Sequence, residues 1–297
     1  MIVIRAQSAG FCWGVERAID IARDFATSGK RPVYTDGPLI HNSQMMDKLQ
    51  AEGIREVGDY QSSTQLDLNA GQENAVLVVR AHGISPERRK YLKSLGIEFK
   101  DATCPDVGIV AGKIRLHAKK GYNTVIFGDR NHPEVIGLLG YTEGRGYPVQ
   151  SEEDIDALPD LGDKVVMVSQ TTMFTDDFQK LGSHLRQKYP EAVVIDTICG
   201  ATKDRQGDIA ILFEEGVEAF VVIGGHHSAN TCKLALLARK TGLPTYHIET
   251  SAEIEETGLN QYRKIGVTAG ASTPEFLIRD ICDKLAAVEP RETAGQA

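Results

Sequence analysis

The chain has 297 residues, 41% hydrophobic and 25% charged, a composition typical of a globular protein large enough for two or three domains. Its net charge of -8 argues against broad binding to nucleic acid or to an acidic membrane surface and leaves only a local pocket for an anion. The N-terminal MIVIRA lacks the parts of a secretion signal, and no stretch approaches the ~18 apolar residues of a membrane span. We therefore expect a cytoplasmic protein.

Five cysteines, at positions 12, 104, 199, 232 and 282, are widely spaced and odd in number. In a chain without a secretion signal, this pattern argues against a disulfide framework. Free thiols or metal ligands remain as the alternatives.

Three of these cysteines mark an internal repeat. They lie 92 and 95 residues apart, and each follows a β-like run, at residues 2–11, 97–103 and 192–198. A helix-like segment comes next in each copy. It ends 17 residues after the cysteine at a glycine suited to a helix C-terminus: Gly29, Gly121 and Gly216. This regularity predicts three copies of one strand–helix unit.

Each copy then continues in the same order. A second strand is predicted at residues 32–37, 124–129 and 219–225, and a polar cluster follows each one. A third strand runs into His82, Thr171 and Ser272. Helix starts are predicted directly afterwards, at Ser85-Pro86, Phe174-Thr175-Asp176 and Thr273-Pro274.

Strands that alternate with helices of this length predict right-handed crossovers and parallel sheets. We expect an α/β fold of three pseudo-symmetric units with small parallel sheets around one central site, because ligands bind beyond the carboxyl ends of such strands. The predicted units are residues 13–103, 104–198 and 199–288, the third completed by the N-terminal strand in 1–12. Residues 289–297 are predicted to be a flexible tail.

The repeated cysteines each stand at a strand-to-helix junction, where a helix N-terminus favours the thiolate. Three thiolates without a fourth equivalent suit an iron-sulfur cluster with one open iron, or a zinc site. The alternative is that they are small buried apolar residues. Their equivalent positions in the three repeats favour instead metal ligation by Cys12, Cys104 and Cys199. Cys232 and Cys282 have no equivalent cysteine in the other repeats and are interpreted as structural.

A second group of repeated positions is rich in hydrogen-bond donors that suit a phosphate or diphosphate. A single histidine is more often structural than functional, but recurrence favours a binding role for His41 and His132. The remaining histidines, at 117, 184, 226, 227 and 247, are interpreted as structural or solvated. The predicted binding residues are His41, His82, His132, Thr171, Ser228, Asn230 and Ser272.

Glu134 is the candidate proton donor. It follows a strand within NHPE, at a predicted helix start beside His132. A carboxyl there could serve as a general acid, or it could only stabilise the helix dipole. No dinucleotide or ATP-binding motif is present.

The motifs GFCWGVERAI, LIHN, AHGIS, DATCPDV, HPEVIG, SQTT, DTICGATKDRQ, HHSAN and VTAGASTPE occur in this order from residue 10 to about 275. Together they resemble the family of 4-hydroxy-3-methylbut-2-enyl diphosphate reductases, the last enzymes of the non-mevalonate isoprenoid pathway. The resemblance implies a three-unit α/β fold around a 4Fe-4S cluster held by Cys12, Cys104 and Cys199. It also implies reductive dehydroxylation of an allylic diphosphate to isopentenyl and dimethylallyl diphosphate.

The same resemblance implies that Glu134 donates the proton with Thr171, and that His132 lies nearby. An external one-electron donor such as ferredoxin or flavodoxin would supply the electrons. The sequence departs from the family pattern at Ala229, where a serine is common, at Asp129, where a histidine is common, and in TCKL at residues 231–234. Ala229 predicts that one diphosphate contact is lost or replaced.

Two other functions remain open for a three-cysteine cluster. A hydro-lyase in the manner of aconitase would turn over without a reductant. An iron-sulfur sensor would hold a cluster without turnover, and such sensors commonly carry a DNA-binding element that the sequence does not contain.

Overall fold

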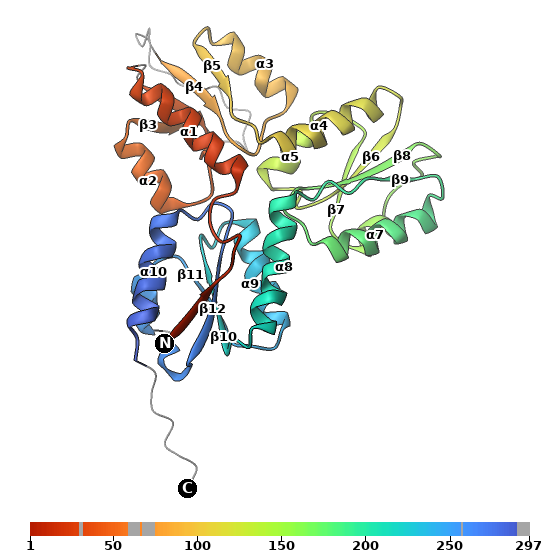
Figure 1. Cartoon of the computed structure of the whole chain (residues 1–297). Coiled ribbons are helices and arrows are strands. Elements are labelled where there is room, and N and C mark those ends of the chain that lie inside the picture. The colour runs from red at the N-terminus through yellow and green to blue at the C-terminus, as the bar shows by residue number, and fades with distance from the viewer. Residues whose placement is uncertain (30–31, 59–65, 67–74, 257, 290–297) are drawn as a thin grey trace. The chain divides into compact units, whose positions relative to one another are not determined.

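The computed structural model describes the chain except residues 30–31, 59–65, 67–74, 257 and 290–297 (Figure 1). The predicted tail therefore lies outside the described residues, apart from Glu289. Two compact bodies are distinguished: the first comprises Met1–Cys12, His41–Met45 and Gly200–Ala297, and the second comprises Trp13–Ile40 and Met46–Cys199.

The second body contains two four-stranded parallel sheets. In one, the strand order is β3 (Ile54–Val57), β2 (Val33–Asp36), β4 (Val76–Val79) and β5 (Glu98–Asp101). Helix α1 (Trp13–Thr27) packs against this sheet, and Leu92 of α3 (Pro86–Ser94) enters its core. Helix α2 (Ser43–Ala51) connects β2 to β3.

The other sheet of this body has the order β7 (Gly146–Val149), β6 (Asn123–Phe127), β8 (Val165–Ser169) and β9 (Val193–Val194). Successive strand residues point to opposite faces. Ile126 and Val168 therefore pack with α4 (Pro105–Ala118) and α5 (Pro133–Leu139). Val125 and Met167 pack on the other face with α7 (Thr175–Lys188).

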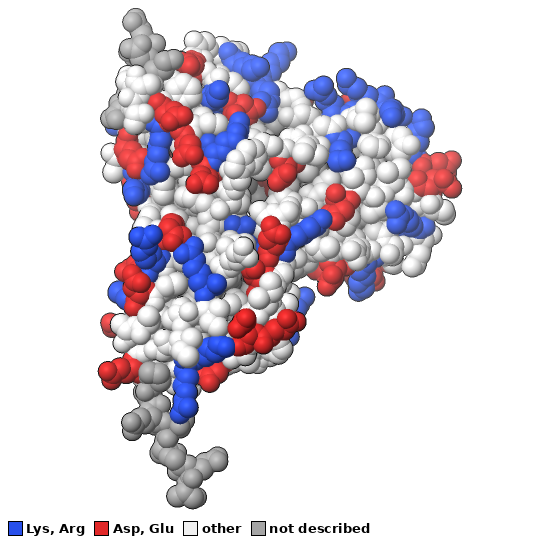
Figure 2. All heavy atoms as spheres, viewed as in Figure 1, with Lys and Arg blue, Asp and Glu red and all other residues white. Residues whose placement is uncertain are grey.

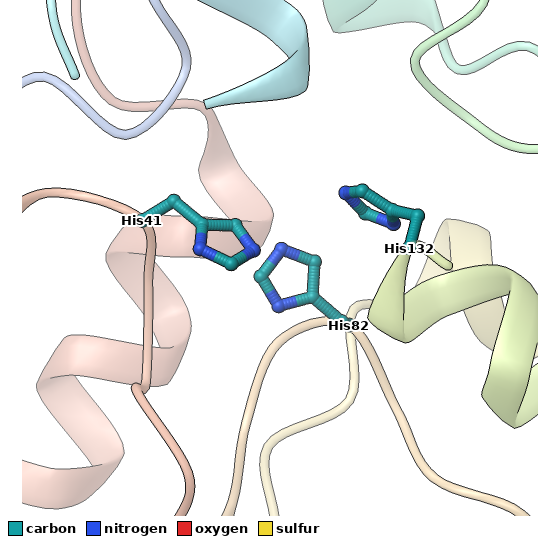
Figure 3. Close-up of side chains that lie close together, drawn as sticks. All are labelled: His41, His82 and His132. Atoms are coloured by element: carbon teal, nitrogen blue, oxygen red, sulfur yellow. The ribbon is translucent and has the colours of Figure 1, made fainter. Parts of the chain in front are cut away.

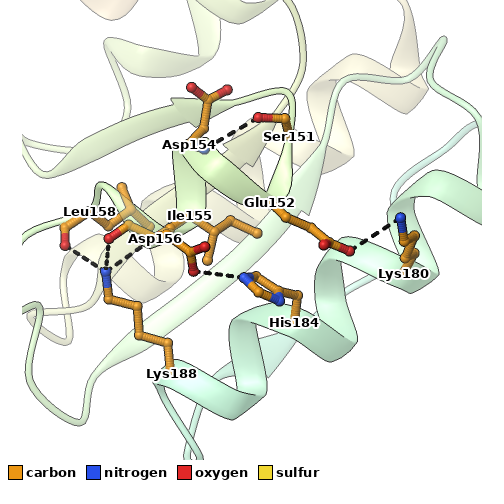
Figure 4. Close-up of polar contacts among 9 residues, drawn as sticks. All are labelled: Ser151, Glu152, Asp154, Ile155, Asp156, Leu158, Lys180, His184 and Lys188. Carbon is orange, nitrogen blue, oxygen red and sulfur yellow. Dashed lines mark hydrogen bonds and ion pairs between the residues drawn. The ribbon is translucent and has the colours of Figure 1, made fainter.

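Short α6 (Glu152–Asp156) is fastened to α7 by polar contacts (Figure 4). The Lys188 ammonium donates to the backbone oxygens of Ile155, Asp156 and Leu158. His184 Nε2 lies 2.8 Å from Asp156 Oδ1. His184 is therefore a structural residue, as its sequence context indicates.

The first body contains one parallel sheet, in the order β11 (Thr245–Ile248), β10 (Ala219–Ile223), β12 (Lys264–Ala269) and β1 (Ile2–Arg5). N-terminal β1 lies beside β12, the place expected for it from the repeat. The helices are α8 (Gly200–Glu214), α9 (Ala229–Lys240) and α10 (Glu275–Ala287), with 3-10 turns at Ser251–Glu256 and Leu259–Gln261.

All three sheets share one strand order, so the predicted fold class, α/β with three small parallel sheets, is confirmed. The boundaries of the three predicted units stay a prediction. Gly29, Gly121 and Gly216 follow α1, α4 and α8 with φ angles of 83°, 80° and 71°, a left-handed conformation that glycine adopts without strain. No helix among the described residues combines the length and apolar character needed to cross a bilayer.

Candidate active site

Two predicted binding histidines meet in the second body. His82 follows β4, and His132 is the N-cap residue of α5. Their ring centroids lie 5.4 Å apart in an edge-to-face arrangement, and the two side chains face one another in Figure 3. The sequence separates them by 50 residues, and the carboxyl ends of β4 and β6 bring them together.

Glu134 is buried, with 2% of its surface exposed, although it stands in the first turn of α5. Thr171 donates to both of its carboxyl oxygens: the backbone nitrogen lies 2.7 Å from Oε1, and the hydroxyl oxygen lies 2.8 Å from Oε2. A carboxyl removed from water needs such partners. Thr171 therefore fixes the orientation of Glu134.

His132 contacts Glu134 through the backbone. The Glu134 N–H donates to His132 Nδ1 at 3.2 Å, which caps α5. Because Nδ1 accepts this bond, the proton of the neutral imidazole is on Nε2. The cap thus uses Nδ1 and holds the His132 ring in place at the start of α5.

The two predicted ligand cysteines of this body each stand directly before a helix, Cys104 before α4 and Cys199 before α8. The Cys104 nitrogen donates to the Ala81 oxygen at 2.9 Å, and the Cys199 nitrogen donates to the Thr171 oxygen at 3.1 Å. Neither cysteine forms a disulfide, and both are half-buried. Each cysteine backbone is thereby joined to a strand end that carries a predicted binding residue, His82 or Thr171.

Gly14 lies against Cys104. A Cβ added at Gly14 would be 2.5 Å from the Cys104 Sγ, closer than side-chain atoms can approach. Gly14 is in the first turn of α1, two residues after Cys12 in the chain. Gly14 is not among the residues predicted from the sequence, although the motif GFCWG, which places a glycine two residues after a cysteine, is a signal for it.

The first body contains Cys12 and the other predicted binding residues. The Cys12 nitrogen donates to the Ala271 oxygen at 3.1 Å, and the neighbouring Ser272 hydroxyl donates to the His41 backbone oxygen at 3.1 Å. A Cβ at Gly225, just after β10, would lie 3.3 Å from the same His41 oxygen. The loops after β10 and β12 thus enclose the His41 backbone.

Ser228 and Asn230 open α9, and both are buried. The Ser228 side chain caps the helix by accepting from the Thr231 nitrogen. Asn230 Nδ2 is buried and has no hydrogen-bond partner among the described residues. Because buried donors are normally satisfied, this atom is suited to a ligand or a water.

Because the three sheets have the same strand order, residues at equal distances after equivalent strands can be aligned. This alignment differs at one position, Thr171, from the equivalence expected from the sequence. His41, His132 and Ser228 are each the fifth residue after β2, β6 and β10, so these positions are equivalent. Thr171, by contrast, is the second residue after its strand, as are Ala81 and Ala271. The equivalent of His82 and Ser272 is Thr172, which accepts a bond from Gln170 Nε2 at 3.0 Å.

Two departures from the family pattern have local explanations. Asp129 Oδ1 accepts from the Asn131 nitrogen at 2.9 Å and shapes the turn before α5. Cys232 donates to the His226 oxygen, and burial raises the pKa of its thiol. Burial also raises the pKa of the Cys282 thiol, which packs in the core of the first body. A raised pKa favours the neutral thiol at both positions, including Cys232, which is exposed to solvent.

Residues 3–286 match the model of the LytB protein family. This chain belongs to the LytB family. It is 68% identical to the 4-hydroxy-3-methylbut-2-enyl diphosphate reductase of Opitutus terrae over 97% of this chain and 100% of the relative. It is 39% identical to the enzyme of that name from Caldanaerobacter subterraneus, over 96% of each chain.

Solved structures of LytB-type enzymes agree with this assignment. The E-1-hydroxy-2-methyl-but-2-enyl-4-diphosphate reductase of Plasmodium falciparum superposes with a TM-score of 0.86 at 30% identity, over 95% of this chain and 87% of that one. An (E)-4-hydroxy-3-methyl-but-2-enyl diphosphate reductase, described as the terminal enzyme of the non-mevalonate pathway, gives a TM-score of 0.70 at 34% identity, over 96% and 99%.

Proposed function

We propose that this protein catalyses the reductive dehydroxylation of (E)-4-hydroxy-3-methylbut-2-enyl diphosphate to isopentenyl diphosphate and dimethylallyl diphosphate. The allylic C–O bond breaks, the hydroxyl leaves as water, and two electrons and two protons are consumed. The observation that carries the proposal is the buried Glu134 carboxyl, fixed by Thr171 beside His132. The 68% identity to a reductase of this name supports it.

We propose that Glu134 supplies the proton that converts the hydroxyl into water. A leaving hydroxide is far less stable than water, so a positioned acid lowers the barrier. The Thr171 hydroxyl can also turn, accept from a protonated Glu134 Oε2 and pass its own proton to the substrate, because a hydroxyl both donates and accepts. We assign His132 Nε2–H as a further hydrogen-bond donor to the substrate in this step.

The diphosphate is assigned to the donors that follow the strands. In the first body these are His41, Ser228, Asn230 and Ser272, and the buried Asn230 Nδ2 supports this role. The Ser272 hydroxyl would turn from the His41 oxygen to a phosphate oxygen. In the second body they are His82, His132 and Thr171. Ala229 has no polar side chain, so we expect one contact fewer at the start of α9.

Cys12, Cys104 and Cys199 are the proposed ligands of a 4Fe-4S cluster. Three cysteines that form no disulfide, each directly before a helix, are a donor set that suits a cluster with one iron open. The missing side chain of Gly14 beside the Cys104 sulfur fits a bulky group there. When bound, the cluster supplies Lewis acidity at the leaving hydroxyl and one-electron reduction.

The electrons come from a separate one-electron carrier such as ferredoxin or flavodoxin. We place the reaction in the cytoplasm, because none of the five cysteines forms a disulfide and a reducing compartment keeps cysteines in that state.

Anaerobic assay of reconstituted protein with the hydroxylated allylic diphosphate and reduced methyl viologen tests the function. We expect both isoprenoid diphosphates, and no product without the reductant. Turnover without reductant would support a hydro-lyase, and a full cluster without any turnover would support a sensor. Cys104→Ser should lose the complete cluster of about four irons, and full iron in that variant would remove Cys104 from the ligand set.

A further inference from the structure

The second body has a surface pocket of about 550 Å³ that reaches a proposed cluster ligand. Its lining includes Cys104 and His82 together with residues of α1, α3, α4 and α5. Glu134 and Thr171 do not line it, and of the residues assigned to the diphosphate only His82 does, so most of the pocket lies outside the proposed substrate site.

Arginines dominate the charge of this pocket. Arg17, Arg89 and Arg115 line it, and Asp101 is the one acidic residue of the lining. Arg89 forms an ion pair with Asp101. Among the described residues, neither Arg17 nor Arg115 forms an ion pair. The pocket is therefore positively charged in a chain whose net charge is -8.

The positive charge continues along α4 and the residues after it. No acidic residue occurs from Val107 to Gly128, while the same stretch holds Lys113, Arg115, Lys119 and Lys120. Figure 2 shows Lys and Arg gathered over α3 and over the outer part of α4. Such a one-signed surface attracts and orients an acidic partner.

An apolar stripe runs along the exposed side of the same helix. Ile109 and Leu116, two turns apart, are 55% and 54% exposed. Between them, a Cβ on Gly112 would meet no atom within 4 Å, so the helix backbone is bare. An apolar centre with a charged rim is the composition of a protein–protein interface.

We propose that this surface, formed by Arg17, Ile109, Gly112, Arg115, Leu116 and Lys119, docks the acidic one-electron carrier protein that reduces the enzyme. The proposal rests on the proposed function, since α4 begins at the cluster ligand Cys104. Two encounters complete one turnover, and each oxidises one carrier by one electron. A small anion would not need the apolar stripe.

The test uses the cluster-loaded enzyme and a reduced 2Fe-2S ferredoxin of net negative charge. In the double variant Arg115→Glu, Lys119→Glu, we expect the KM for ferredoxin to rise at least about tenfold at low ionic strength, because steering changes association rates by ~10- to 1,000-fold. Turnover with reduced methyl viologen, the KM for the diphosphate and the iron content should not change. Leu116→Asp should raise the KM for ferredoxin in the same way.

Arg186→Glu is the matched control. Arg186 is an exposed residue of α7, the helix that covers the opposite face of the β6–β8 sheet, and its reversal should leave the KM for ferredoxin unchanged. An unchanged KM in the double variant, or an equal rise in the control, overturns the docking surface. Should the double variant lose iron, the neutral pair Arg115→Gln, Lys119→Gln makes the same test.

Failure of the proposed function gives a different result, because wild-type enzyme would then be inactive with methyl viologen as well. Wild-type activity with methyl viologen but with neither ferredoxin nor an acidic flavodoxin would overturn the docking surface alone.

Discussion

Thr171 donates a hydrogen bond to each carboxyl oxygen of Glu134, from its backbone nitrogen at 2.7 Å and from its hydroxyl at 2.8 Å. The two residues come from different crossovers of the β6–β8 sheet, and both are buried. Because the two bonds use different atoms of Thr171, a substitution of its side chain removes the hydroxyl bond and keeps the backbone bond. The two contacts can therefore be tested separately.

Glu134→Gln tests the acid. The amide has nearly the same size but no acidic proton, so we expect kcat to fall at least about 100-fold, the lower range for loss of a general acid. Cluster absorbance and the Kd for the diphosphate should stay as in wild type. A kcat close to the wild-type value would contradict the role of Glu134.

Thr171→Val tests the hydroxyl separately. The backbone bond to Oε1 remains, while Oε2 loses its donor, so we expect kcat to fall about tenfold. Because the same hydroxyl is also assigned to the diphosphate, the KM should rise as well. Thr171→Ser keeps the hydroxyl and should restore most of the activity. Wild-type turnover in the valine variant would show that the hydroxyl is not needed and that the proton relay is wrong.

Gly14→Ala tests the space beside Cys104. The new Cβ would come within 2.5 Å of the Cys104 Sγ, so we expect less iron per chain after reconstitution and a proportional loss of turnover. Gly108→Ala is the control, because a Cβ on this α4 glycine meets no atom within 4 Å and alanine favours a helix by up to about 1 kcal/mol. Equal iron in both variants would contradict the contact.

His247 predicts a pH dependence of stability. Burial lowers its pKa below 6.5, and its Nε2 lies 2.8 Å from the Gly224 oxygen. The unfolded chain therefore binds a proton at a higher pH than the folded chain does. The stabilising contribution of neutral His247 is present above pH 6.5 and is lost as the pH falls through the folded pKa.

Denaturant titrations of wild type and His247→Gln across pH 5 to 8 measure this effect. We expect the free energy of unfolding of wild type to decrease more steeply below pH 6.5 than that of the variant, because glutamine does not titrate. Parallel pH curves would show that His247 does not contribute.

The sequence by itself determined the repeating strand–helix pattern, the parallel sheets, and the glycines that end α1, α4 and α8. These features depend on local periodicity and on backbone conformations that only some residues adopt. The positions of the three repeated cysteines, Cys12, Cys104 and Cys199, directly before helices could be predicted for the same reason.

Only the tertiary structure decided one edge strand of each sheet and the contacts across the sheets. The edge strands β3, β7 and β11 have four residues each, and each includes partly or fully exposed positions, so their composition does not separate them from loops. Three features of the site depend on segments that are far apart in the chain. They are the burial of Glu134, the approach of Gly14 to Cys104, and the equivalence of Thr172 with His82 and Ser272. Such contacts depend on how crossovers return to a sheet, which local sequence patterns do not encode.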